Sequence, residues 1–400
     1  MNFEFYRSFR FILLALFISL SVNAFGQQLE QRRDDIYKFP EQILEDLEND
    51  TVKYYTKAAH EFSFIGDYKK ALLYADIGRP QFATLTPEQI KYFKSFKPVG
   101  ANQFLKEKAQ EEQIIIINEG HHLPLHRVFT HSLLQDLYEA GFRYFGAETL
   151  SHTDKELNQR GYPVFSSGFY TKEPQYGELV RAALSIGFKV FAYEGESGGR
   201  EREIEQAENI ARVLQKDPEA KILVHVGYDH IREDSALHVW EKAMAGRLDE
   251  ITGINPFTVN QEILTEKSRP ELENPYLKLA SVTEPTIYVN ADGDGFAGPP
   301  GFGAYDVRVF HPKTSYIHGR PDWMFTLGRK PVFINKRIKV NYPVLVFAYK
   351  AGEDISQAIP VDVIELKSKQ DKKALALKKG KYSILVLDKN GGQQTVSIKD

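Results

Sequence analysis

Between residues 110 and 245 the chain alternates short apolar runs with longer amphipathic segments, and this alternation constrains the fold more than any other feature. Residues 114–117 form a continuous β-branched run, which is typical of a strand buried on both faces. Strands are also predicted over 144–149, 189–193 and 222–226, and helices over 125–137, 176–186, 200–215 and 235–245. Such alternation predicts an α/β fold in which helices flank a mainly parallel sheet.

Two smaller segments flank this region. Residues 27–97 are predicted to be helical, and 58–72 resemble one tetratricopeptide unit, a helix, a turn at Gly66 and a second helix. One such unit cannot bury its apolar face alone, so we expect a helical hairpin packed on the main domain. Near the C-terminus, strands over 344–349, 361–366 and 382–387 predict a small β unit, or extra strands of the main sheet. The predicted organisation is therefore a leader over 1–26, a helical hairpin region over 27–97, an α/β domain over 98–341 and a β-rich unit over 342–400.

The first 26 residues have the pattern of a secretory signal peptide. Arg7 and Arg10 precede an apolar run over 11–20, and small or polar residues then lead to Ala24-Phe25-Gly26-Gln27. A membrane anchor is the alternative, but the run is shorter than the roughly 20 residues that cross a bilayer. We therefore expect an exported protein, periplasmic, secreted or on the cell surface, with no stable transmembrane segment after signal cleavage.

Composition excludes several classes of chemistry. The chain has no cysteine, so disulfides, thiolate metal sites, a cysteine nucleophile and a lipid anchor on a cysteine are all excluded. A formal net charge of -3 lacks the basic excess of nucleic-acid-binding proteins. The partner that we expect is a small-molecule or peptide substrate, and no nucleic acid.

Carboxylates and histidines follow all four predicted strands of the α/β region. The segments that leave these strands are Asn118-Glu119-Gly120-His121-His122, Ala147-Glu148-Thr149, Tyr193-Glu194-Gly195-Glu196 and Val226-Gly227-Tyr228-Asp229-His230. In open α/β sheets, ligands bind just beyond the carboxyl ends of the strands. We therefore predict a chemical site built from Glu119, His122, Glu148 and His230.

These residue types permit two kinds of chemistry, and the sequence leaves both open. A histidine held by a carboxylate can act as a general base on water. Alternatively, His122, Glu148 and His230 are candidate ligands for a divalent metal ion that acidifies a bound water. His121 is expected to point away from its neighbour His122, and His225 to pack against a helix.

The same segments resemble a known family. Residues 116–122, a following helix that carries Arg127, and residues 141–148 resemble the opening of the erythromycin esterase-like proteins. These share a superfamily with the ChaN-like haem-binding proteins and the TraB/TIKI proteins. Residues 224–231 resemble the late Gly-x-x-His element of the family, although Asn118 stands where the family usually has glycine.

The resemblance implies hydrolysis of an ester or amide by an activated water. Glu119 and His122 keep the family's Glu-x-x-His spacing, which makes His122 the leading base, with Glu119 and Glu148 orienting it or holding a metal. His230 is then the second essential histidine, and Arg127 a group that binds an anion or an oxyanion.

Glu194, at the end of the third strand, is the second substrate-binding candidate. A divalent metal ion is the expected cofactor, and haem is the less favoured alternative. The alternatives are a haem- or metal-binding protein without turnover and an interaction module.

Overall fold

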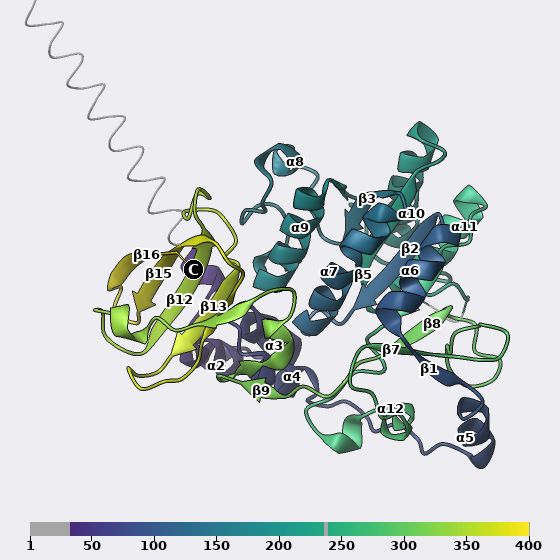
Figure 1. Ribbon diagram of the computed structural model, residues 1–400, viewed down its shortest axis with the longest axis horizontal. Helices are drawn as coiled ribbons and strands as arrows, with labels where there is room; N and C mark the ends of the chain where they lie inside the picture. The colour runs from purple at the N-terminus through teal and green to yellow at the C-terminus, as the bar shows by residue number, and fades with distance from the viewer. Residues whose placement is uncertain (1–32, 236–238, 400) are drawn as a thin grey trace, which may run out of the picture.

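An eight-stranded sheet forms the centre of the larger part of the protein (Figure 1). The computed structural model describes residues 33–235 and 239–399, so the expected signal peptide lies outside the described residues. In spatial order the strands are β1 (Lys97–Gly100), β7 (Thr286–Val289), β8 (Val307–Phe310), β6 (Phe257–Asn260), β2 (Ile114–Glu119), β5 (Lys221–Gly227), β3 (Phe142–Ala147) and β4 (Lys189–Ala192). Strands β8 to β4 pair in parallel, whereas β1 and β7 pair antiparallel at one edge. The predicted α/β fold with a mainly parallel sheet is confirmed.

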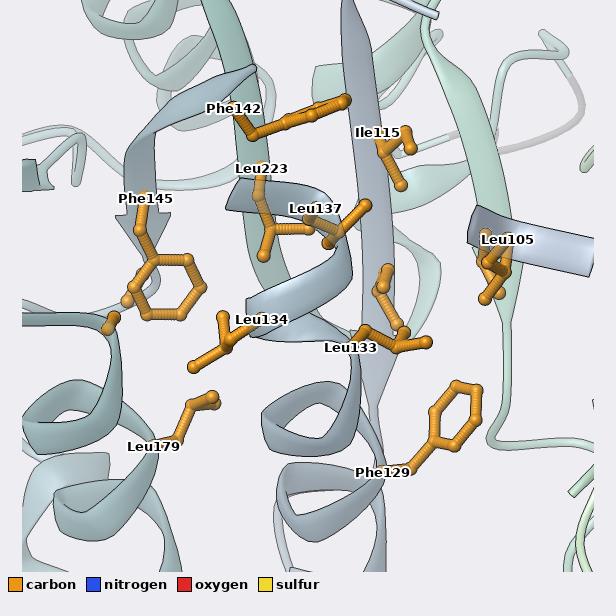
Figure 2. Packing of buried hydrophobic residues seen from close by; sticks show 14 of the residues in the cluster. Leu105, Ile115, Phe129, Leu133, Leu134, Leu137, Phe142, Phe145, Leu179 and Leu223 are labelled. Atoms are coloured by element: carbon orange, nitrogen blue, oxygen red, sulfur yellow. The ribbon is translucent and has the colours of Figure 1, made fainter. Parts of the chain in front are cut away.

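Helices cover both faces of this sheet. One face carries α6 (Ala101–Glu111), α7 (Pro124–Glu139) and α9 (Pro174–Ile186), and the other carries α10 (Gly199–Lys216) and α11 (Met244–Thr252). Because side chains alternate along a strand, Ile115 packs with the first group of helices and Ile116 with the second. Figure 2 shows Leu137 of α7 beside Ile115 in the first core, with Leu133 one turn away on the same helix.

Two features of this domain differ from the expectation. Strand β6 lies between β8 and β2, although no strand is predicted over these residues from the sequence. A helix was expected over 235–245, but residues 236–238 lie outside the described ranges and the observed helix begins at Met244. The start of that helix is set by tertiary structure, because the Met244 N–H donates to the buried carboxylate of Glu203, at 2.9 Å.

A separate antiparallel sheet forms the C-terminal unit, in the order β13 (Asp362–Leu366), β12 (Val344–Lys350), β15 (Lys381–Asp388) and β16 (Gln393–Lys399). The β-rich character predicted for this region is therefore confirmed, and these strands do not extend the main sheet. Short strand β11 (Lys330–Val332) pairs with β14 (Leu375–Leu377), so the chain enters this unit before the expected boundary at residue 342.

The N-terminal helices pack against both the C-terminal sheet and the main domain. They are α2 (Pro40–Asn49), α3 (Tyr55–Phe64), α4 (Tyr68–Ala75) and α5 (Pro87–Phe93). Ile43 and Phe62 share one core with Phe347 of β12 and Leu385 of β15. The hairpin also contacts the main domain as expected, because the His60 ring lies 6.1 Å from the His121 ring and the Tyr68 hydroxyl donates to Glu173 at 3.2 Å.

Short elements complete the described chain. These are α8 (Leu157–Arg160), α12 (Pro275–Leu279), β9 (Tyr316–Ile317), β10 (Arg320–Pro321) and the 3-10 turns η1 (Tyr170–Lys172), η2 (Tyr228–Ile231), η3 (Pro270–Leu272), η4 (Asp322–Phe325) and η5 (Asn335–Arg337). Within 33–235 and 239–399, none of the helices combines the length and apolar character that a bilayer crossing demands.

Candidate functional site

The carboxyl ends of β2, β5 and β3 lie side by side, because these strands are parallel neighbours in the sheet (Figure 1). Glu119 is level with Gly227 across β2 and β5, and both residues are buried. Glu148 follows β3, and its Oε2 accepts a hydrogen bond from the Gly227 N–H at 2.6 Å. The strand ends that carry Glu119, Glu148 and His230 therefore meet at one edge of the sheet, as the sequence predicts.

Glu119 is held by a buried arginine. Arg127 of α7 donates to both Glu119 oxygens at 2.6 Å, and its Nη1 donates to Glu173 at 2.9 Å. Burial alone would raise the pKa of Glu119, but the guanidinium outweighs this effect and holds the pKa well below its usual range. We expected Arg127 to bind a substrate anion. Instead its side chain is fully buried and committed to these two carboxylates and the His121 carbonyl.

His121 lies between the two strand-end carboxylates. Its Nδ1 is 2.9 Å from Oε1 of Glu119, and its Nε2 is 3.9 Å from Oε2 of Glu148. The imidazole stacks on Tyr170 of η1, with ring centroids 3.8 Å apart. One carboxylate and one aromatic ring thus orient His121, and its second nitrogen faces the middle of the site.

His122 points elsewhere, as is usual for neighbours that leave a strand. Its Nδ1 is 3.2 Å from the Tyr228 hydroxyl, and its buried Nε2 has no hydrogen-bond partner among the described residues. Burial lowers the pKa of His122 well below its ordinary value. The expectation that Glu119 and Glu148 orient His122 is therefore corrected, because the tight turn at Gly120 places His121 against them instead.

His225 belongs to the support of the site. Its Nε2 is 2.9 Å from Oε2 of Glu119, and its Nδ1 is 3.2 Å from the hydroxyl of Thr130 on α7. The expected packing against a helix is present, but the ring also completes the set of partners around the Glu119 carboxylate. Glu119 consequently has a partner on every side and is fixed in position.

His230 forms the second carboxylate–histidine pair. A carboxylate oxygen of Glu203 on α10 lies 2.8 Å from its Nδ1, and Oε1 of Glu148 lies 3.7 Å from its Nε2. Burial opposes the charged imidazole, but the Glu203 hydrogen bond and the Glu148 charge prevail and raise the pKa of His230. Trp240 stacks on the ring, with centroids 4.8 Å apart.

Arg202 of α10 lies at the solvent side of the site. Its Nη2 donates to Glu148 at 2.9 Å, its Nε donates to Glu194 at 2.7 Å, and its Nη1 is 3.0 Å from Nε2 of His230. Glu194, expected to contact substrate, lies at the site and pairs with this guanidinium. The side chains of Arg202 and Glu194 remain 25% and 20% exposed, so this end of the site opens to water.

Sequence reasoning missed the two residues from α10. Glu203 lies one turn before Ala207 on the buried face of this helix. A carboxylate at a core-facing helix position is rarely buried without a partner. The position of Glu203 in the sequence could therefore have indicated that it pairs with another residue. Arg202 carries no comparable signal, because an arginine at the start of an exposed helix is ordinary.

Both strand exits have strained backbones. Thr149, after Glu148, has φ 59° and Tyr228, after Gly227, has φ 41°. Such values are rare for residues with a Cβ and persist where the surroundings hold them. The Asn118 side-chain amide donates to the Tyr228 carbonyl at 2.8 Å, which holds the second turn in place.

A divalent metal ion does not fit this arrangement. His121, Glu148 and His230 offer suitable donor types, but Arg202 already places its positive charge within hydrogen-bond distance of Glu148 and of His230 Nε2. His122 is turned away from this set. Across the two described ranges, no group of three or more His, Asp or Glu side chains is arranged to hold an ion.

Haem does not fit the donors either. The Nε2 of His230, the atom that would ligate iron, faces the Arg202 guanidinium. His122 borders a cavity of about 30 Å³, which is the size of a water molecule. The ligand sets expected for metal and for haem are therefore not assembled.

The fold and the site together define an α/β protein with a carboxylate–histidine centre at the carboxyl edge of its sheet. No family model and no curated protein matches the chain. Among solved structures it is similar to the type III effector HopBA1, at 11% identity and a TM-score of 0.36, over 57% of this chain and 100% of that one. It is also similar to RRSP, a MARTX toxin effector domain from Vibrio vulnificus CMCP6, at 15% identity and a TM-score of 0.31, over 59% of this chain and 45% of that one. Likenesses this distant carry no functional argument.

Proposed function

We propose that this protein is an exported hydrolase that activates water to cleave an ester or amide bond. One observation carries the proposal. His121 and His230 each place Nδ1 on a carboxylate and turn Nε2 towards the same residue, Glu148. A carboxylate on Nδ1 selects the tautomer whose Nε2 accepts a proton, and it stabilises the imidazolium that forms. The resemblance to the erythromycin esterase-like proteins and the signal-peptide pattern support the same conclusion.

The two histidines suit different roles. His121 takes a proton from water on Nε2, and the water oxygen attacks the carbonyl carbon of the substrate. His230 starts as the imidazolium, which its raised pKa favours, and gives a proton to the departing oxygen or nitrogen as the bond to the carbonyl carbon breaks. Arg202 is the cation at the open side, and it stabilises the negative oxygen of the intermediate.

The test is a set of histidine variants assayed on a panel of chromogenic esters and amides. His121→Ala and His230→Ala are expected to lower kcat by about 10²–10⁴-fold, because each removes a proton-transfer group. His122→Ala is the matched control and should keep activity within a few-fold, with circular dichroism confirming the fold of all three. Full turnover by His121→Ala, or its loss only in His122→Ala, contradicts the assignment.

Export is tested separately. Expression of the full chain in a bacterial host, followed by cell fractionation and mass spectrometry of the N-terminus, should find a mature protein that begins near residue 27 outside the cytoplasm. A cytoplasmic protein that retains its first residues contradicts this part of the proposal and leaves the chemistry untouched.

A further inference from the structure

The C-terminal region carries a strong local positive charge. Residues 329–399 contain 15 Lys or Arg and 6 Asp or Glu, a formal charge of +9 in a chain whose total is -3. A charge asymmetry of this size within one chain indicates an anionic partner for the basic part.

Five exposed cations of this region lie on two segments that touch. Lys330 in β11 and Lys336 and Arg337 in η5 come from the first segment, and Lys369 and Lys372 come from the loop before β14. The Asn335 side-chain amide joins the segments, because it donates to the Lys369 carbonyl at 3.4 Å and to the Asp371 carbonyl at 2.9 Å. The ion pairs of this unit involve other residues, for example Lys389 with Glu41, so within the described chain these five cations have no carboxylate at ion-pair distance.

Three exposed apolar side chains lie on β9 and just after β11. Tyr316 is 52% exposed, Ile317 46% and Phe333 51%. The His318 ring lies 5.2 Å from the Phe333 ring, and the His318 carbonyl accepts from the Ala374 N–H at 3.2 Å. The tip of β9 is thereby attached to the two cationic segments. Figure 1 shows the C-terminal sheet at one end of the molecule with β9 beside it.

We propose that this surface, the basic apolar patch of Lys330, Lys336, Arg337, Lys369, Lys372, Tyr316, Ile317 and Phe333, binds an anionic lipid surface. The cations are attracted to the negative headgroups, and each attraction weakens with salt. The exposed rings and the isoleucine gain further by entering the boundary between headgroups and acyl chains. A soluble polyanion would satisfy the cations alone and would leave the apolar side chains in water.

The test is flotation of the full chain with vesicles of phosphatidylcholine or of equal parts phosphatidylcholine and phosphatidylglycerol. The protein should bind the anionic vesicles selectively, and binding should fall as salt is added. A variant with Lys330→Ala, Lys336→Ala and Arg337→Ala should bind on the order of 100-fold more weakly. The control, Lys94→Ala with Lys155→Ala and Lys216→Ala, removes three exposed charges elsewhere and should bind like the parent.

A second pair of variants separates lipid from other anions. Phe333→Ser should weaken binding to the anionic vesicles several-fold, whereas Phe82→Ser, at a position 46% exposed, should not. The parent and all of these variants carry the same N-terminal segment, so that segment contributes equally to the binding of each. Equal binding of the two triple variants overturns the proposal. The proposal is also overturned if Phe333→Ser binds the anionic vesicles as well as the parent does and the protein binds heparin as tightly as the vesicles. The patch would then be a site for polyanions in general.

Discussion

Gly227 lies so close to His121 that a Cβ atom on Gly227 would be 2.1 Å from Cε1 and 2.4 Å from Nε2 of the imidazole. The same atom would be 2.9 Å from Oε2 of Glu148. Only glycine lets β5 approach the ring this closely, and the approach also lets the Gly227 N–H donate to Glu148. The contact therefore sets the position of the histidine proposed as the base.

Replacing this glycine should displace the base. Gly227→Ala is expected to push the His121 ring away from Glu148, with a loss of about 1–3 kcal/mol in the free energy of unfolding from overpacking. Activity should fall as far as in His121→Ala. Urea unfolding and the imidazole NMR signals measure the two effects. Gly198→Ala is the control, because nothing lies within 4 Å of its added Cβ. An unchanged His121 signal in Gly227→Ala would show that the site tolerates the Cβ.

The Glu203–His230 pair should make stability depend on pH. The folded-state pKa of His230 is raised, so this pair contributes fully below the unfolded pKa of about 6.5 and loses its contribution as pH rises through the folded pKa. Glu203→Gln is therefore expected to lose about 1–3 kcal/mol more near about pH 5 than near about pH 9. Urea unfolding across this range measures the difference. Glu201→Gln, on the exposed face of the same helix, should show no such dependence, and an equal loss at both pH values in Glu203→Gln contradicts the pairing.

Arg127 should dominate the stability of the site. Arg127→Met leaves Glu119 and Glu173 buried without their cation, which costs about 3–5 kcal/mol. The folded-state pKa of Glu119 is lowered, so its contribution is present above the unfolded pKa of about 4.5 and is lost as pH falls through the folded pKa. The difference in unfolding free energy between Arg127→Met and the parent should consequently be largest near neutral pH and shrink as the pH falls.

A matched variant completes that experiment. Arg143→Met removes an exposed guanidinium that stacks on Tyr138, and it should change the unfolding free energy by less than about 1 kcal/mol. Comparable losses in Arg127→Met and Arg143→Met would mean that the buried carboxylates do not depend on Arg127.

The predictable part of the site is the part that follows from strand period and parallel pairing. Glu119 and Glu148 leave neighbouring strands, so their convergence could be inferred from the sequence alone. Glu203 and Arg202 could not be placed, because they reach the site only through the way α10 packs on the sheet. The choice between His121 and His122 depends on a few backbone angles after β2, which residue types do not encode.

The fold shows the same division. The isoleucines of β2 are buried on both faces, as their run predicts. The β-branched composition of this segment suits the central strand of a sheet that helices cover on both sides. The packing of the N-terminal helices on the C-terminal sheet could not be predicted, since an apolar stripe identifies a buried face and not what covers it. Tertiary contacts between the two ends of the chain decide that question.

These terminal contacts should be cooperative. Ile43 of α2 is fully buried in one core with Phe347 of β12, so Ile43→Ala should lower the unfolding free energy by about 2–5 kcal/mol. Hydrogen exchange should then accelerate in α2 and β12 together. Ile251→Ala, at a position 43% exposed on α11, is the control and should have little effect. Unchanged protection of β12 in Ile43→Ala would show that the helices fold independently of the sheet.

Arg202 should keep metal ions out of the site. Its guanidinium lies 2.9 Å from Glu148 and 3.0 Å from Nε2 of His230, so a divalent cation there would face a fixed positive charge. Prolonged dialysis against a chelator is therefore expected to leave the unfolding midpoint and any activity of the parent unchanged.

In Arg202→Ser the repulsion is gone, and His121, Glu148 and His230 offer donors that zinc accepts. At about 100 times its Kd, zinc should then stabilise this variant by about 2.7 kcal/mol. The double variant Arg202→Ser, His230→Gln lacks the same guanidinium and also lacks one histidine ligand for zinc. Zinc should therefore stabilise it much less. A parent that loses stability on chelation would show that the arginine does not exclude the ion.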